Sequence, residues 1–290
     1  MSKIAILTDS SCDIPQEMAE KYNIDIMSFH ILLDDVDYVE RESCSNEEFY
    51  AKMRAAKGVP STAAITPIQF CEKYCQYVDE GYTDVIHVPI NRSGSSTYNN
   101  AVMAQGMLRE ERPEHHLNIH LLDPHTYSMV FGWYLCEMAR KLQNGAELRH
   151  VISEFETQMN KMEVILGPYS LKQMKKSGRI SAAAAVMGEL MGIRPIITLI
   201  DGKTRVESKV RGDDKVIPAM IDLCKKRTEG VEDFDYMIGH TSIPQAAELE
   251  KACRKAFGKA PLVTFNLGGV VSANTGPDTL ALVYVGKPRD

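Results

Sequence analysis

Short apolar runs alternate with amphipathic stretches along the first half of the chain. Three such pairs are KIAIL and PQEMAEKY, DVIHVPI and STYNNAVMAQGML, and LNIHLL and SMVFGWYLCEMARKL. Short apolar runs rich in β-branched residues indicate strands, and the stretches between them have the period of a helix. Strands that alternate with helices pair in parallel through right-handed crossovers. The first half therefore predicts a Rossmann-like α/β domain with a parallel sheet.

Residues 23–45 interrupt this alternation. The runs IDIMSFHILL and VDYVE flank Asp34-Asp35, and two strands joined by such a turn form a hairpin. We expect a small hairpin insertion near residues 23–45, followed by a helix that begins near Asn46, whose side chain can cap it.

The pattern changes again after the helical stretch that ends near Lys161. The second half contains IRPIITLID and GKTRVESKV around a turn at Asp201-Gly202, and then DYMIGH, PLVTF and LALVYVG. Strands that follow each other without a helix imply a mixed sheet. Because 290 residues exceed what one core usually supports, we predict two domains, residues 1–162 and residues 163–290.

Composition and charge narrow the functional classes. The chain is 44% hydrophobic and 25% charged, as in globular proteins, and its net charge of −6 disfavours a nucleic-acid partner. No apolar run reaches the length of about 18 residues that a transmembrane helix needs. The apolar run in MSKIAILTDS is too short for a secretory signal. We expect a cytoplasmic protein without a transmembrane segment.

The seven cysteines are odd in number and scattered, which favours reduced thiols over a disulfide framework. Cys71 and Cys75 are spaced to share one face of a helix. No second pair of cysteines or histidines with zinc-finger spacing follows them. We therefore expect no metal site, and expect the cysteines to be buried as small apolar side chains.

Nucleotide-binding motifs are missing. A Walker loop that ended in Gly202-Lys203-Thr204 would need glycine where Ile197 stands, and no GxGxxG follows a predicted strand. We therefore expect no nucleotide cofactor. A serine nucleophile in GxSxG is also incomplete, because Tyr98 replaces the second glycine. A hydrolase or acyltransferase that uses Ser95 stays open as an alternative function.

Small hydroxyl side chains gather at predicted strand ends, in Asp9-Ser10-Ser11, Ser61-Thr62 and Ser95 to Thr97. The carboxyl ends of parallel strands form a crevice where ligands bind, and helix N-termini there favour an anion. Each of these residues could also serve only as a helix cap. Their conjunction indicates a ligand with one carboxylate, held by hydrogen bonds.

Ordered motifs along the whole chain strengthen this hypothesis, namely KIAILTDSSCDIP, PSTAAITPIQF, Ser95 to Tyr98, LKQMKKSGRIS, IRPIITLIDGK, VRGDDK and Asn274 to Pro277. Together they resemble the DegV family of fatty-acid-binding proteins, some of which are the acyl-carrying subunit of bacterial fatty acid kinase. The resemblance implies a two-domain α/β fold with the acyl chain in a tunnel between the domains.

The resemblance also implies roles for single residues. Thr62 and Ser95 match positions that contact the ligand carboxylate, and Asn274 and Thr275 match a further part of the ligand site. Asn274 departs from the family pattern, which usually has histidine there. Arg179 and Arg211 match basic positions that face a partner kinase.

We expect the chain to bind a palmitate-like long-chain fatty acid and to present its carboxylate to a separate ATP-dependent kinase that forms the acyl phosphate. It would then be a non-catalytic subunit without a cofactor. A lipid transport or sensor module with no kinase fits the same binding features.

Overall fold

The computed structural model describes residues 3–178 and 192–289. Contacts between residues divide the chain into two compact units. One unit contains Met1–His30 and Ala63–Met159, and the other contains Ile31–Thr62 and Asn160–Asp290. This division differs from the expected one in two places: residues 31–62 belong with the second half of the chain, and the later boundary lies after Met159 and not after residue 162. No described helix is long and apolar enough to span a membrane.

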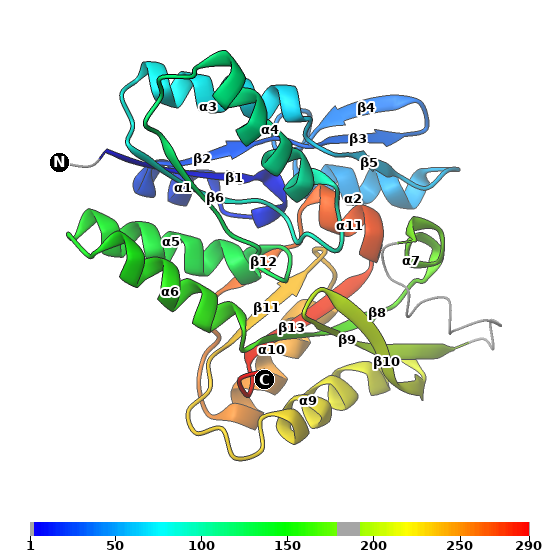
Figure 1. Ribbon diagram of the computed structural model, residues 1–290. Coiled ribbons are helices and arrows are strands. Elements are labelled where there is room, and N and C mark those ends of the chain that lie inside the picture. Colours follow the sequence, from blue (N-terminus) through cyan, green and yellow to red (C-terminus); the bar gives the residue numbers. More distant parts are fainter. Residues whose placement is uncertain (1–2, 179–191, 290) are drawn as a thin grey trace. The chain divides into compact units, whose positions relative to one another are not determined.

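The first unit contains a four-stranded parallel sheet in the order β2-β1-β6-β7. Helices α3 and α4 lie on one face of this sheet, and α1 and α5 lie on the other (Figure 1). The expected parallel sheet is confirmed. The elements are β1 (Ile4–Asp9), α1 (Gln16–Tyr22), β2 (Ile24–Met27), α3 (Pro67–Asp79), β6 (Asp84–Val88), α4 (Thr97–Glu111), β7 (Asn118–Leu121), α5 (Met129–Gln143) and α6 (Leu148–Met159), with a 3-10 turn at Ser10–Cys12.

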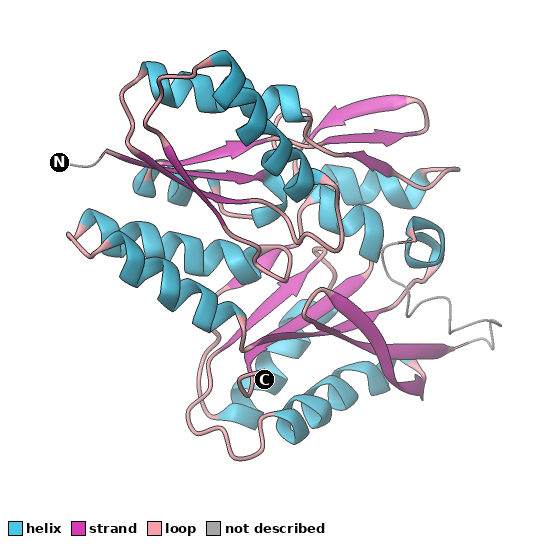
Figure 2. Cartoon of the chain, viewed as in Figure 1, coloured by secondary structure: helices cyan, strands magenta, loops and turns pink. Residues whose placement is uncertain are grey.

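The second unit contains a six-stranded mixed sheet in the order β10-β9-β8-β13-β11-β12. Only β11 and β12 pair in parallel. Helices α9 and α10 cover one face of the sheet over a buried apolar core (Figures 1 and 2). The elements are β8 (Met162–Pro168), α7 (Lys172–Ser177), β9 (Ile193–Ile200), β10 (Lys203–Arg211), α9 (Val216–Arg227), β11 (Tyr236–His240), α10 (Gln245–Phe257), β12 (Thr264–Asn266), α11 (Gly269–Thr275) and β13 (Thr279–Val285), with a 3-10 turn at Asp213–Lys215.

The expected hairpin insertion is narrower than residues 23–45. Strands β3 (His30–Leu33) and β4 (Val36–Val39) form the hairpin, and β5 (Ser61–Ala63) completes a three-stranded sheet. Asp34 and Asp35 have φ of 47° and 64°, as the tight turn requires. The residues before the hairpin instead form β2, because they pair with β1 in the parallel sheet.

The N-cap of helix α2 (Asn46–Ala55) is not Asn46, as expected from the sequence. Ser45 Oγ accepts the N–H of Glu48 at 3.2 Å, and the Glu48 carboxylate accepts the N–H of Ser45 at 2.8 Å. This reciprocal pair is a capping box. Ser45 is therefore the N-cap, and Asn46 is the first residue of the helix.

Candidate functional site

Helix α11 is held at its N-terminus by the polypeptide between β4 and α2 and by α2 itself. The Glu40 carboxylate, 6% exposed, accepts the N–H of Val270 at 2.7 Å. A negative charge near a helix N-terminus is stabilising. In α2, the Tyr50 hydroxyl donates to the Leu267 carbonyl just before α11. These contacts fix the position of α11 within the second unit.

Thr275 is the last residue of α11 and is 5% exposed. Its Oγ1 atom has no hydrogen-bond partner among the described residues. Buried hydroxyls are normally paired, and an unpaired one costs about 1–3 kcal/mol. The Thr275 hydroxyl therefore marks a place where a further polar group, such as a ligand carboxylate, would be stabilising.

Gln173 of α7 lies beside the end of α11, because the two helices pack together. It is 2% exposed, and its Oε1 atom also has no partner within the described chain. A Cβ atom at Gly276 would lie 3.3 Å from this Oε1, so the amide faces the backbone next to Thr275. Because amide O and N can exchange places by rotation, Gln173 can offer an acceptor or a donor here. The sequence analysis missed this residue, and its only signal was its place in LKQMKKSGRIS.

Asn274, which precedes Thr275, is half-buried. Its Nδ2 atom donates to the carbonyl of Val270 at 2.8 Å, one turn earlier in α11. This bond uses one of the two amide hydrogens, and the other hydrogen and the amide oxygen can still form hydrogen bonds. Asn274 and Thr275 are thus adjacent polar residues at the C-terminal end of one helix.

The other expected site residues lie on different elements. Thr62, half-buried in β5, and Arg211, exposed at the end of β10, belong to the same unit as Thr275. Ser95 belongs to the other unit. Arg179 lies outside the described residues.

The hydroxyl residues after β1 are engaged in local structure. Asp9 accepts the N–H groups of Ser11 at 3.1 Å and Ile90 at 2.6 Å, and Ser10 Oγ accepts the N–H of Phe29 at 3.0 Å. Asp9, Ser10 and Ser11 are each at most 1% exposed. These side chains therefore stabilise the strand end, as caps do.

Ser95 hydrogen-bonds to its neighbour Thr97, and not to a catalytic base among the described residues. Its Oγ atom accepts the N–H of Thr97 at 3.2 Å and lies 2.9 Å from Thr97 Oγ1, and no histidine in the described part of the chain hydrogen-bonds to it. His87 is fully buried on β6 against the Tyr74 hydroxyl, and burial lowers its pKa to about 3. A serine hydroxyl without a base is a weak nucleophile. The geometry gives no support to the hydrolase alternative.

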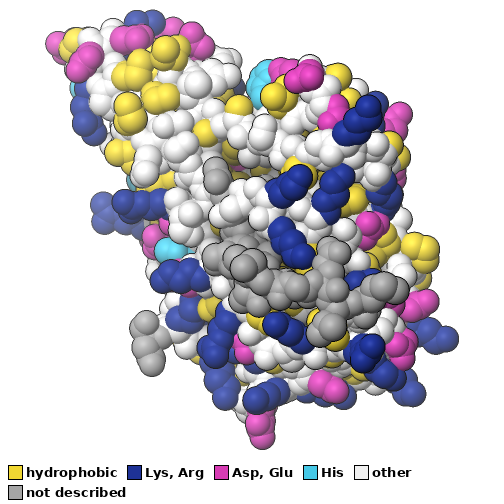
Figure 3. Space-filling model, turned by 90° about the vertical axis from the view of Figure 1, so that its right-hand side faces the viewer, with side chains coloured by type: hydrophobic (Ala, Val, Ile, Leu, Met, Phe, Trp, Pro, Cys, Tyr) yellow, Lys and Arg dark blue, Asp and Glu magenta, His cyan; other side chains and the backbone are white. Residues whose placement is uncertain are grey.

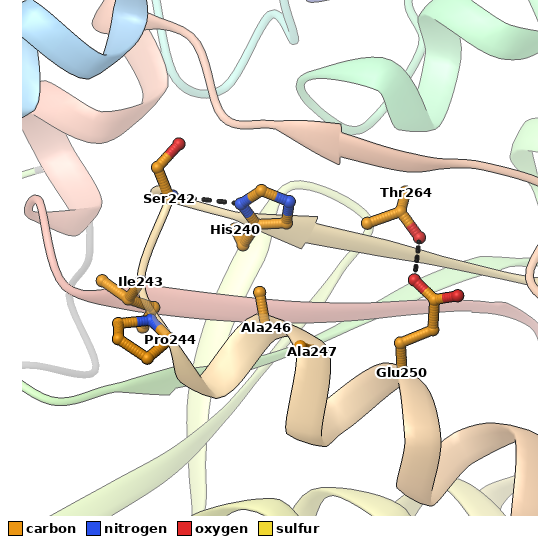
Figure 4. Close-up of a pocket in the computed structure, with 8 residues that line it drawn as sticks. All are labelled: His240, Ser242, Ile243, Pro244, Ala246, Ala247, Glu250 and Thr264. Carbon is orange, nitrogen blue, oxygen red and sulfur yellow. Dashed lines mark hydrogen bonds between the residues drawn. The ribbon is translucent and has the colours of Figure 1, made fainter.

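A pocket of about 460 Å³ opens at the carboxyl end of β11 (Figure 4). The Ser242 N–H donates to His240 Nδ1 at 3.0 Å, and burial lowers the pKa of the His240 ring. Hydrogen bonds from Arg254 and Thr264 lower the pKa of the Glu250 carboxyl. A carboxylate in the wall repels a second one. This pocket therefore suits a polar or cationic ligand better than the head group of a fatty acid.

Comparison with known proteins connects these features to a family. The family model described as "Uncharacterised protein, DegV family" matches residues 3–287. The chain belongs to the DegV family. A DegV domain-containing protein of Staphylococcus aureus is 30% identical to it, with 98% of each chain covered. Another, from Clostridium perfringens, is 29% identical over 98% of this chain and 99% of the relative.

Solved structures of DegV proteins have the same fold. A stearic acid-binding protein from Eubacterium ventriosum matches with a TM-score of 0.89 and 22% identity, over 98% of this chain and 99% of that one. A fatty acid binding DegV family protein from Streptococcus agalactiae matches with a TM-score of 0.85 and 25% identity, over 99% and 100%. The expected fold class, a parallel N-terminal sheet and a mixed C-terminal sheet, is confirmed.

Proposed function

We propose that this DegV protein binds a long-chain fatty acid and presents its carboxyl group to a partner ATP-dependent kinase that forms the acyl phosphate. The observation that carries the binding half is the buried Thr275 hydroxyl, which lacks a partner among the described residues. The Streptococcus agalactiae protein, similar over the full chain, is titled as fatty acid binding. The first observation supports a polar contact at the end of α11, and the second supports a fatty acid as the ligand.

In this proposal the carboxylate accepts a hydrogen bond from Thr275, and Gln173 turns its amide to donate a second one. Asn274 contributes its remaining N–H, and Thr62 of the same unit is a further carboxylate contact, while Ser95 stays a candidate contact on the strength of its motif. The donors are neutral side chains. Hydrogen bonds of this kind hold the carboxylate in one orientation without neutralising it, so an oxygen can still attack a phosphoryl group. The chain supplies position, and the partner supplies ATP.

Thr275→Val tests the binding site directly. Valine has the shape of threonine without the hydroxyl, so we expect palmitate to bind about tenfold more weakly, because a hydrogen bond to a charged group is worth about 1.5–3 kcal/mol. Binding of the matching C16 alcohol should change much less. Thr62→Val and Ser95→Ala are expected to act in the same direction. The measurement is displacement of a fluorescent fatty acid from the full chain by the acid or the alcohol.

Thr279→Val is the matched control for this experiment. Thr279 is also fully buried, but its Oγ1 atom already donates to the Thr275 carbonyl at 2.9 Å. This variant should lower thermal stability and leave the preference for acid over alcohol unchanged. In contrast, Thr275→Val should not lower the stability of the lipid-free chain, because it removes an unpaired polar atom. If Thr275→Val weakens acid and alcohol equally, Thr275 does not contact the carboxylate.

A basic surface on the second unit supports the partner half of the proposal. Exposed lysines and arginines lie along α7 and β10, and Figure 3 shows many such side chains on this side of the molecule. They are Lys172, Lys175, Lys176, Lys203, Arg205, Lys209 and Arg211. Because the whole chain has a net charge of −6, this local positive charge favours an acidic partner surface.

Arg211→Ala tests the partner surface. We expect it to leave fatty-acid affinity unchanged and to lower kcat/KM for acyl phosphate formation by about tenfold, measured with a bacterial fatty acid kinase subunit and ATP. Arg205→Ala removes the same charge from the same strand and should have a smaller effect. If the wild-type chain binds lipid but supports no acyl phosphate formation, the transport or sensor function replaces the kinase partnership.

A further inference from the structure

Two cysteines and a glutamate come together where α3 packs against α4. Cys71 and Cys75 lie one turn apart on α3, and Glu111 is the last residue of α4. The two sulfur atoms and a carboxylate oxygen all lie within 4.8 Å of one another. The spacing of the two cysteines is visible in the sequence. Glu111 lies 36 residues after Cys75, so the sequence pattern does not connect it to them.

The spacing of these atoms fits a tetrahedral metal ion. With Zn–S near 2.3 Å and Zn–O near 2.1 Å, a sulfur and an oxygen ligand of one zinc ion lie about 3.6 Å apart. Cys75 Sγ lies 3.7 Å from Glu111 Oε2. The remaining separations, at most 4.8 Å, need only a small rotation of a side chain. We propose that Cys71, Cys75 and Glu111 bind a thiophilic divalent cation of the zinc type.

The surroundings of the three groups suit such an ion. Cys71 is 1% exposed and Cys75 is 8% exposed, whereas Glu111 is exposed. An ion could therefore enter from the side of the carboxylate and keep a fourth position for water, as zinc sites with three protein ligands do. Burial raises the pKa of the Cys75 thiol, and the nearby Arg112 charge only partly opposes this rise. Asp79 lies 3.6 Å from the Arg112 guanidinium.

Without a cation, both cysteines are favoured as neutral thiols. Burial, followed by the nearby Cys75 and Glu111, raises the pKa of the Cys71 thiol to about 12. The only favourable polar contact between Cys75 and Glu111 is then a weak S–H donor to a carboxylate. A bound divalent cation reverses this balance because it favours both thiolates and the carboxylate. It would also connect α3 to α4.

The test is a Zn²⁺ titration of the reduced full chain in competition with a chromophoric chelator, together with Cd²⁺ titration followed by thiolate-to-metal absorption. We expect one equivalent of metal per chain and a rise in melting temperature with Zn²⁺. Cys75→Ser and Glu111→Gln should each weaken Zn²⁺ binding at least about tenfold, and Cys75→Ser should also reduce the Cd²⁺–thiolate absorption. Glu111 is at the surface, so Glu111→Gln should fold like the wild type even if a cysteine variant does not.

Cys44→Ser is the control, because Cys44 is a half-buried thiol outside this group. It should leave Zn²⁺ affinity unchanged. Binding that is absent in the wild-type chain, or that survives Glu111→Gln and Cys75→Ser without loss, overturns the proposal. Binding that is lost in Cys44→Ser instead also overturns it, because the metal would then lie elsewhere.

Discussion

Shortening a saturated fatty acid from sixteen to twelve carbons is expected to weaken its binding by about 200-fold. Each buried methylene contributes about 0.8 kcal/mol, so four of them contribute about 3 kcal/mol, and each 1.4 kcal/mol is tenfold in affinity. One hydrogen bond to the carboxylate contributes less. The tail should therefore dominate affinity, and the head group should set orientation.

The measurement is the same fluorescent displacement assay with a series of saturated acids. Mass spectrometry of an organic extract from the purified chain should correspondingly find an acid of about C14 to C18, because shorter acids are lost during purification. An affinity that changes less than about tenfold between C12 and C16 would mean that the tail stays in water. The proposed function would then be wrong even if Thr275 binds a carboxylate.

Local patterns predicted much of the fold because the interactions that determine it often join residues that are close together in the sequence. The turns at Asp34-Asp35 and Asp201-Gly202 both have residues with positive φ, and both join the expected hairpin strands. Strand β8 was missed, because its seven residues are all buried. A fully buried strand shows no alternation of apolar and polar residues, so its sequence does not distinguish it from a buried helix.

The candidate site was predicted only in part, because its contacts join distant parts of the chain. Thr275 was identified through its motif, but nothing near it in sequence shows that Gln173 faces it. Glu40 reaches Val270 across 230 residues, and it fixes the helix that carries Thr275. Conversely, Asp9 and Ser10 match the pattern expected of a ligand site, but their side-chain oxygens accept hydrogen bonds from backbone N–H groups.

Glu163 on the missed strand β8 is a buried carboxylate in an ion pair with the partly exposed Arg227, and disruption of this pair should have a large effect on stability. The Arg227 guanidinium donates to both Glu163 oxygens, and the Tyr284 hydroxyl donates to Glu163 Oε2 at 2.6 Å. The Glu163 side chain is 9% exposed. We expect Arg227→Met to lower the free energy of unfolding by about 3 kcal/mol, because it leaves a buried carboxylate without its cation. Urea denaturation of the lipid-free chain measures this change.

The double variant Arg227→Met with Glu163→Gln separates the charge from the packing. Glutamine still accepts the Tyr284 hydrogen bond but carries no charge, so the double variant should recover at least about half of the lost stability. A single variant as stable as the wild type at pH 7 would show that solvent reaches Glu163, and that the strand is less deeply buried than its 9% side-chain exposure indicates.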